Sequence, residues 1–170
     1  AGAEHNDWRS IDFAKVSATA IEKARRSRNP VAIEPGRYTT ILEPQAVADL
    51  VVFITGALAA RTADEGRSVF SLPGGATRVG TKLFDPRINI LSDPWRPQLA
   101  TFTASDDGVP AQAMHLVRNG VVESLRYSRY WAQQKNTQPS GPFALVLEPS
   151  TPGISVEEMI KTTKRALLVS

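Results

Sequence analysis

The chain has 170 residues, of which 42% are hydrophobic, and it carries a formal net charge of +3 with a pI near 9.4. This length and hydrophobic content suit one ordinary core and do not require a second one. No apolar run approaches the roughly 18 residues of a membrane span, and no charged-then-apolar signal segment opens the chain, so we expect a soluble, cytoplasmic protein. The absence of cysteine excludes disulfides and thiolate metal sites.

The dense run of positive charge in this sequence is Lys23-Ala24-Arg25-Arg26-Ser27-Arg28. It closes a predicted helix, where cations complement the carbonyl end of the helix dipole. A phosphate-binding patch is the alternative interpretation, but no aromatic side chain is interleaved with the run. We therefore favour a solvated helix end and do not expect nucleic acid as a partner.

The first helix follows a start without periodicity, residues 1–9, which we expect to be a frayed end. From Ser10, a plausible N-cap, apolar residues at helical spacing predict a helix to about Ser27. Pro30 then prevents the helix from continuing.

A strand and a second helix come next. Pro35-Gly36 predicts a turn into a strand over Arg37–Leu42, and a helix begins at Pro44 and extends to Arg61. Apolar residues cover nearly the whole circumference of this helix, so we expect it to be buried on most sides.

The other apolar runs predict four short strands: Val69–Leu72, Val79–Phe84, Ile88–Leu91 and Phe143–Leu147. A polar loop, Gln133–Pro142, precedes the last of them. Ser155 and Glu158 form a capping box that opens another helix. The final run, Ala166 to Ser170, is interpreted as a buried strand, which is typical of a fragment or of a sheet completed by another chain.

The strongest local signal is a hairpin. Two period-2 runs, Ala113–Val117 and Val121–Leu125, are joined through Asn119-Gly120, and Asn-Gly between such runs predicts a two-residue type I′ turn. In this register Val117 faces Val122. One face then carries these two valines, and the other carries Met114, Leu116 and Leu125.

An acidic turn with Asp106, Asp107 and Gly108 precedes the hairpin. Adjacent carboxylates can chelate magnesium or calcium or act as acid and base, but Asp-Asp-Gly is also ordinary turn chemistry, which we favour. After the hairpin, Tyr127, Tyr130 and Trp131 predict a helix with an aromatic side. With Arg126 and Arg129 these rings can grip a peptide or stack on bases, although such spacing is more often core packing.

Several segments in register resemble one known family. They are the acidic turn with Gly108-Val109-Pro110, the Asn119-Gly120 hairpin and Arg129-Tyr130-Trp131-Ala132, together with residues 34–44, 66–70, Phe84-Asp85-Pro86, Ser92-Asp93-Pro94 and 164–169. Their order resembles the TldD/PmbA family, also called modulators of DNA gyrase, over roughly Ile11 to Ser170.

The resemblance implies an α+β fold, with a mixed, largely antiparallel sheet and packed helices, that forms part of the C-terminal domain of a TldD/PmbA-like protein. Residues 1–30 would then be an N-terminal segment and helix from the end of a preceding domain. Residues 31–170 would be a partial C-terminal domain, and the chain an internal piece of a larger protein.

Catalytic members of this family hold zinc through a His-Glu-x-x-x-His motif on the helix after the first strand. The corresponding positions here fall near Val51, Val52 and Gly56, which can neither bind zinc nor act as a base. Of the two histidines, His5 lies in the irregular start and His115 in the hairpin, and a metal role for His115 is disfavoured. We expect no catalytic residue, no metal site and no cofactor in this chain.

This departure resembles the PmbA/TldE branch. It implies the non-catalytic component of a cytoplasmic metallopeptidase complex that acts on peptides, with zinc supplied by a TldD-like partner subunit. Two alternatives stay open: an active zinc peptidase whose ligands lie outside this fragment, and a DNA gyrase-linked regulator, against which the dispersed charge argues.

The partner would be a TldD-like subunit or a second copy, joined through strand edges such as that of the hairpin. The candidate contacts to peptide or partner are Asp106, Asp107, Gly108, Arg129 and Tyr130.

Overall fold

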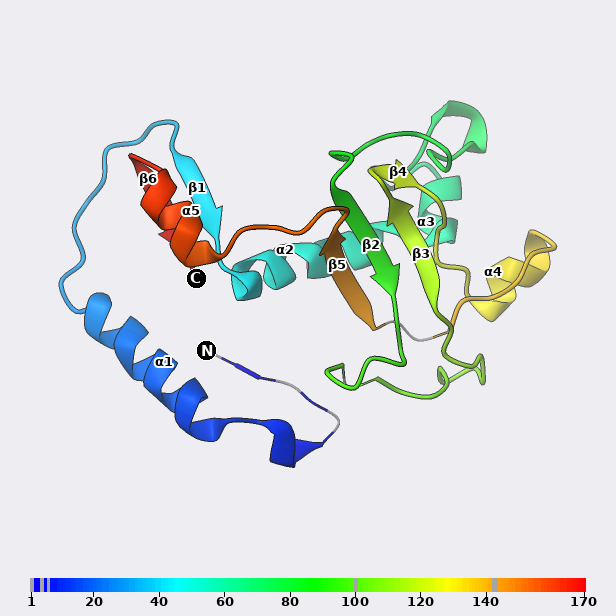
Figure 1. The fold of residues 1–170 in the computed structure, drawn as a ribbon. Helices are drawn as coiled ribbons and strands as arrows, with labels where there is room; N and C mark the ends of the chain where they lie inside the picture. Colours follow the sequence, from blue (N-terminus) through cyan, green and yellow to red (C-terminus); the bar gives the residue numbers. More distant parts are fainter. Residues whose placement is uncertain (1, 4, 6, 100, 142–143) are drawn as a thin grey trace. The chain divides into compact units, whose positions relative to one another are not determined.

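The computed structural model describes residues 2–3, 5, 7–99, 101–141 and 144–170, and it shows the expected α+β architecture (Figure 1). The chain forms two compact units. One unit combines Ala1–Ala48 with Ile154–Ser170, and the other is the continuous segment Asp49–Gly153. The predicted division at residue 30 is a different one and stays a prediction. Within the described residues, no helix is long and apolar enough to cross a membrane.

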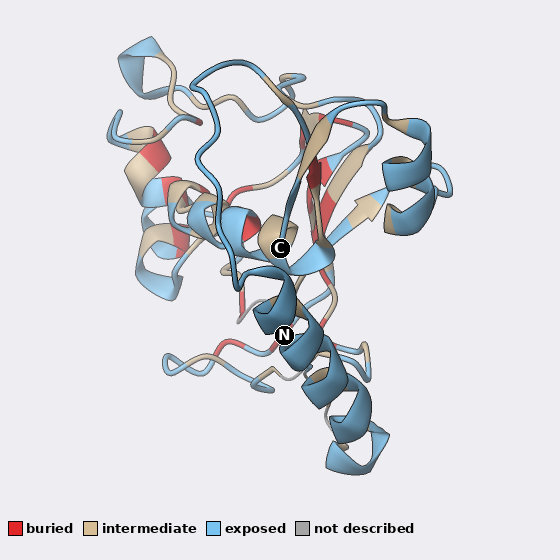
Figure 2. Ribbon diagram, turned by 90° about the vertical axis from the view of Figure 1, so that its left-hand side faces the viewer, coloured by how far each residue is buried: buried red, intermediate tan, exposed pale blue. Residues whose placement is uncertain are grey.

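Helix α1, Phe13–Arg26, lies in the discontinuous unit. Asp12, rather than the predicted Ser10, is its N-cap, because the Asp12 carboxylate accepts a hydrogen bond from the Lys15 backbone N–H at 2.9 Å. Ser10 instead ends the short 3₁₀ turn Trp8–Ser10. Basic residues occupy the last turn of α1 as predicted, and no residue of the helix is buried (Figure 2).

The same unit contains a parallel pair of strands. Strand β1, Thr39–Leu42, pairs with β6, Ala166–Val169, and helix α5, Val156–Thr162, precedes β6. The serine half of the predicted capping box is confirmed at its N-terminus, where the Ser155 hydroxyl accepts from the Glu158 backbone N–H at 3.2 Å. The prediction that the final strand is buried is wrong. Leu168 and Val169 are 41% and 42% exposed, because the described residues do not fully cover the faces of the two-stranded sheet from which these side chains project.

The continuous unit is built on a four-stranded antiparallel sheet in the order β4-β3-β2-β5 (Figure 1). Strand β2 is Ile88–Ser92, β3 is Met114–Arg118, β4 is Val121–Val122 and β5 is Leu145–Pro149. A register shift between Ile90 and Leu91 bends β2 against β3. Phe143, the predicted start of the β5 strand, lies outside the described residues.

The hairpin formed by β3 and β4 is confirmed. Asn119 and Gly120 have φ values of 49° and 79°, as a type I′ turn requires, and Val117 faces Val122. Strand β4 is shorter than predicted, because the N–H groups of Glu123 and Ser124 both donate to the Leu116 carbonyl and end the regular ladder.

The chain that leaves β4 pairs instead with the segment after helix α2, Pro44–Ala57. The Arg126 N–H donates to the Leu58 carbonyl, and the Ala60 N–H donates to the Arg126 carbonyl, both at 2.8 Å. These bonds divert Leu58 and Ala59 from helical geometry. The predicted helix over Pro44–Arg61 therefore ends early, and a short helix α3, Ala60–Asp64, follows.

Helix α2 is also less buried than its composition predicted. Val51 is its single buried residue, whereas Leu50 is 56% exposed and Phe53 is 82% exposed. The expectation of burial on most sides is wrong, because the described residues of the chain do not cover the side that carries these two side chains.

The core of the continuous unit lies around the hairpin. Both faces of the hairpin are buried, since Val117 and Val122 are as inaccessible as Leu116 and Leu125 on the other face. The remaining buried members of the cluster are Leu58, Ala60, Ala63, Phe70 and Ile90.

The predicted strands over residues 69–72 and 79–84 are instead irregular, with isolated bridges at Ser71–Thr77 and Lys82–Val121 around a 3₁₀ turn, Pro73–Gly75. Residues 80–84 cover the outer edge of β4: the Gly80 N–H donates to the Val122 carbonyl at 2.8 Å, and the Val122 N–H donates to the Thr81 carbonyl at 3.0 Å. The hairpin therefore offers no open edge, contrary to prediction. Within the described residues, the uncovered edge of this sheet belongs to β5.

Candidate functional site

The acidic turn predicted between residues 105 and 110 is a closed loop stabilised by Ser105. The Ser105 N–H donates to the Val109 carbonyl at 2.9 Å, and the Gly108 N–H donates to the Ser105 carbonyl at 2.8 Å. The Ser105 hydroxyl also donates to the Asp107 carboxylate. Gly108 has a φ of 75°, so the turn uses glycine where other residues would be strained.

Asp107 connects this loop to helix α4, Arg129–Gln134. Its carboxylate accepts a hydrogen bond from the Arg129 backbone N–H at 3.3 Å, while the Ser128 hydroxyl, the N-cap, accepts from the Trp131 N–H at 3.3 Å. The hydrogen bond from Ser105, assisted by the one from Arg129, lowers the pKa of Asp107. An ionised carboxylate therefore stands at the positive end of the α4 dipole.

Three of the five predicted contact residues meet here. A β-carbon on Gly108 would lie 3.6 Å from an Arg129 guanidinium nitrogen, so Gly108 leaves room for that side chain over the loop. Tyr130 is 59% exposed, and its described ring contact is with Trp131, with ring centroids 6.5 Å apart. Asp106 is exposed. Within the described residues, no hydrogen bond, ion pair or ring contact joins Asp106 or Tyr130 to the Asp107–Arg129 pair.

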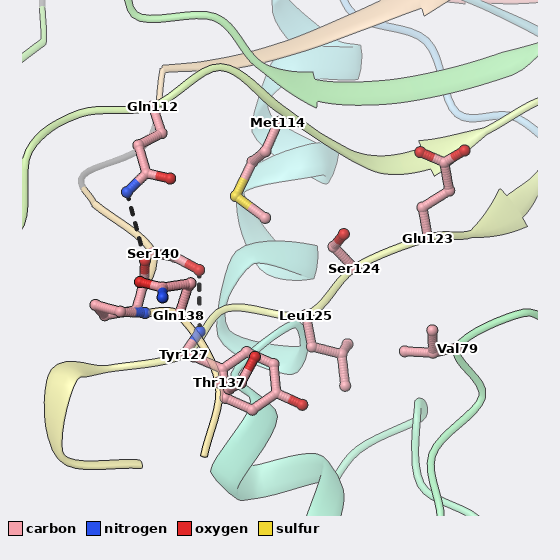
Figure 3. Close-up of a pocket in the computed structure, with 11 residues that line it drawn as sticks. Val79, Gln112, Met114, Glu123, Ser124, Leu125, Tyr127, Thr137, Gln138 and Ser140 are labelled. Atoms are coloured by element: carbon pink, nitrogen blue, oxygen red, sulfur yellow. Dashed lines mark hydrogen bonds between the residues drawn. The ribbon is translucent and has the colours of Figure 1, made fainter. Parts of the chain in front are cut away.

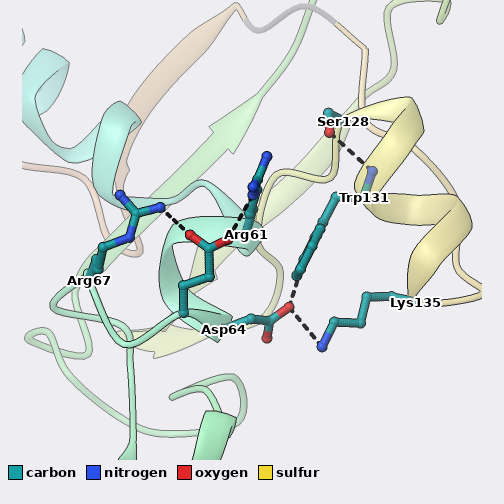
Figure 4. Close-up of polar contacts among 7 residues, drawn as sticks. Arg61, Asp64, Arg67, Ser128, Trp131 and Lys135 are labelled. Atoms are coloured by element: carbon teal, nitrogen blue, oxygen red, sulfur yellow. Dashed lines mark hydrogen bonds and ion pairs between the residues drawn. The ribbon is translucent and has the colours of Figure 1, made fainter.

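A polar network links α4 to α3 (Figure 4). The Trp131 indole N–H donates to the Asp64 carboxylate at 2.7 Å, and the Lys135 ammonium lies 3.2 Å from the same oxygen. The side chain of Asp64 is 11% exposed, so this carboxylate is satisfied in a largely desolvated position. Lys135 and Arg61 also lie 5.3 and 5.6 Å from the Trp131 ring centroid, within the range of cation–π attraction.

The sequence did not point to Asp64, because its partner lies far along the chain and no local pattern encodes the contact. A tryptophan that is even partly buried needs an acceptor for its indole N–H, and this requirement is the one signal in the sequence for such a partner. The prediction that the aromatic side of α4 packs inward holds for Trp131 and not for Tyr130.

The helix that corresponds to the metal motif is α2. Val51 is buried there, Val52 is 63% exposed, and a β-carbon on Gly56 would meet nothing within 4 Å. Among the described residues, no three His, Cys, Asp or Glu side chains are grouped closely enough to hold a metal ion. His5 accepts a hydrogen bond from the Asp7 N–H at 2.9 Å, and His115 is half-buried opposite Leu91 in the sheet.

Comparison with protein families gives one match: residues 35–170 match the PmbA/TldA metallopeptidase C-terminal domain. No curated protein matches the chain significantly.

Among the solved structures that match the chain, three illustrate the shared fold. TldE from Thermococcus kodakarensis is 23% identical, with a TM-score of 0.78 over 94% of this chain and 38% of that one. A candidate modulator of DNA gyrase from Thermotoga maritima is 21% identical, with a TM-score of 0.81 over 96% of this chain and 39% of that one. Another, from Bacteroides thetaiotaomicron, is 18% identical, with a TM-score of 0.78 over 96% of this chain and 36% of that one. The chain therefore spans well under half the length of each of these proteins.

Proposed function

Because the chain belongs to the TldD/PmbA family and has the fold of its C-terminal domain, we propose that it is the non-catalytic, TldE-like component of a cytoplasmic complex that acts on peptides. The observation that carries the proposal is the composition of α2 at the metal-motif positions. Val51, Val52 and Gly56 supply no zinc ligand and no general base. In this proposal, a TldD-like partner subunit supplies the zinc.

Two surfaces support a role in peptide or partner binding. The first is the loop and helix end formed by Asp107, Gly108 and Arg129, with Asp106 and Tyr130 exposed nearby in the sequence. It presents a carboxylate, a guanidinium and an aromatic ring, which suit contacts with the charged and polar groups of a peptide.

The second surface is the outer edge of β5. Where β5 pairs with β2, the Asp93 N–H donates to the Ala144 carbonyl and the Ser150 N–H donates to the Arg87 carbonyl. In an antiparallel pair, every second residue of a strand bonds to the neighbouring strand. The backbone groups of Leu145 and Leu147 therefore point away from β2, and no strand among the described residues pairs with them. An extended segment can add to such an edge without requiring particular side chains, which suits broad peptide substrates.

The proposal is tested by metal content and by hydrolysis. Elemental analysis of the purified chain should find only traces of zinc. The chain alone should not cleave a peptide library, whereas mixing it with a TldD-like subunit should give cleavage that a chelator abolishes. The TldD-like subunit alone is the control.

The alternative is a zinc peptidase whose ligands lie elsewhere, which the short span of the chain relative to its relatives leaves open. One zinc per chain, or hydrolysis by the isolated chain that is lost in Asp106→Ala or Asp107→Ala, would establish that alternative and contradict the non-catalytic assignment.

A further inference from the structure

A pocket of about 260 Å³ lies within the continuous unit, at the end of the hairpin (Figure 3). Its apolar wall is formed by Met114, Leu125 and Val79, and Leu125 is buried. The opposite wall is the turn over residues 137–140, which follows α4. The volume lies just below that of pockets for drug-sized ligands, which suits a single side chain and the backbone on either side of it.

Several hydroxyl groups face this space without a protein partner. Among the described residues, the hydroxyls of Ser124, Tyr127 and Thr137 form no hydrogen bond, although all three residues line the pocket. The Ser140 hydroxyl accepts from the Tyr127 N–H at 3.1 Å and keeps its own proton available. A hydroxyl both donates and accepts, so these groups can satisfy a ligand that needs both.

The pocket is close to neutral. Its one carboxylate, Glu123, is paired with the Arg118 guanidinium at 2.7 Å. Burial, followed by the nearby Asp64 carboxylate, raises the pKa of Tyr127, so its hydroxyl stays protonated at neutral pH. Gln112 and Gln138 add amides at the exposed rim. A charged ligand, whether anionic or cationic, would find no unpaired opposite charge among the described residues that line the pocket.

We propose that this pocket binds the carboxamide side chain of a glutamine or asparagine in an extended peptide. The stem of such a side chain fits the apolar wall, and its terminal amide both donates and accepts, as the hydroxyls that line the pocket require. An aliphatic side chain of the same size would displace water and leave those hydroxyls without a partner. This inference deepens the proposed peptide-handling function and rests on it for the class of ligand.

The test is an amide-shift NMR titration of the isolated chain with capped tripeptides. N-acetyl-Ala-Gln-Ala-amide is compared with peptides that carry Glu, Lys or Leu at the centre. About ten ligand atoms enter the pocket, so we expect binding in roughly the millimolar range. Saturable shifts should occur at Ser124, Leu125 and Thr137, and the glutamine peptide should bind at least about threefold more tightly than the others, as the loss of one hydrogen bond predicts.

Two variants and a matched control complete the experiment. Thr137→Val removes one hydroxyl at constant shape and should weaken binding of the glutamine peptide about three- to tenfold. Ser124→Leu fills the pocket and should abolish binding. Thr103→Val makes the same change as the first variant at an exposed position outside the pocket and should leave binding unchanged. The amide spectrum of each variant shows whether it is folded.

The proposal is overturned if the glutamine peptide produces no saturable shifts, if the four peptides bind equally, or if Thr137→Val binds like the unaltered chain. Should Ser124→Leu fail to fold, Thr137→Val alone decides between these results. Because binding is measured on the isolated chain, its failure is distinct from a failure of partner-dependent hydrolysis.

Discussion

At the scale of the residue, Gly120 shows how two separate constraints can act at one position. Its φ of 79° lies in the left-handed region, which disfavours any residue with a β-carbon. A β-carbon there would also lie 2.4 Å from the Phe84 carbonyl oxygen and 2.8 Å from that of Asp85. The second constraint arises from the loop that covers the hairpin, so the Asn-Gly turn is required by packing as well as by turn geometry.

Gly80 is subject to the first constraint alone. Its φ of 83° is close to that of Gly120, but a β-carbon on Gly80 would meet nothing within 4 Å. Gly80→Val should reduce the free energy of unfolding by about 1–2 kcal/mol, from the left-handed conformation alone. Gly120→Val should reduce it by a further 1–3 kcal/mol or so, from the clash with the two carbonyls. Urea unfolding of both variants measures the difference. Equal effects would contradict the close approach of residues 84–85 to the turn.

Asp85, in the same loop, gives a prediction about pH. Hydrogen bonds from the Arg87 side chain and then from its backbone N–H lower the pKa of Asp85 from 3.8 to about 2. A carboxylate whose pKa is lowered on folding contributes stability above its unfolded pKa, and the contribution is lost as the pH falls toward the folded value. Asp85→Asn should therefore destabilise the chain at pH 7, and the difference from the unaltered chain should shrink between about pH 4 and pH 2.

The measurement is the unfolding midpoint of both proteins across this pH range, with a carboxyl NMR titration of Asp85 to give the pKa directly. Asp106→Asn is the matched control, because Asp106 is an exposed carboxylate in a turn for which no such pair of arginine contacts is described. A constant difference between Asp85→Asn and the unaltered chain would show that the Arg87 contacts do not persist in solution.

At the scale of the element, the short helices α3 and α4 are stabilised and positioned by contacts with other segments of the chain. Helix α3 has five residues and α4 has six, and neither is long enough to be stable alone. Asp107 and Ser128 satisfy N–H groups at the start of α4, and the Asp64–Trp131 bond attaches α4 to α3. Much of the geometry of the acidic-turn site therefore depends on a contact on the other side of α4.

Trp131→Phe tests that dependence. The substitution keeps most of the ring but removes the N–H that bonds to the Asp64 carboxylate, and we expect a loss of about 1–2 kcal/mol in the free energy of unfolding. Asp64→Ala removes the acceptor, so the effects of Trp131→Phe and Asp64→Ala should be coupled by more than about 0.5 kcal/mol in a double-mutant cycle. Tyr130→Phe, on the exposed side of the same helix, should change stability by less than about 0.5 kcal/mol. Additive effects of the first pair would contradict the assigned bond.

At the scale of the whole molecule, predictions from the sequence succeed where the cause is local. The Asn119-Gly120 turn and the Ser155 cap each depend on a few adjacent residues, and both are confirmed. The end of α2 is different, because it depends on the Arg126 carbonyl, which no pattern in residues 44–61 encodes. For the candidate site, the segment order shared with the family indicated Asp107, Gly108 and Arg129, which lie together. The pocket at the end of the hairpin could not be predicted, since its walls come from distant segments.

The discontinuity of the first unit has a consequence for how the protein is made. Strand β1 pairs in parallel with β6, so this unit requires both an early and a late part of the chain, whereas the residues of the continuous unit are all adjacent in sequence. During synthesis on the ribosome, the continuous unit is complete before β6 has emerged. Until then β1 remains an unpaired strand, and such strands are prone to pair with other nascent chains. Thr39 and Thr40 of β1 are exposed, and their hydroxyl-bearing side chains make the surface of the strand less apolar. They therefore lower the risk that β1 pairs with another chain before β6 is available.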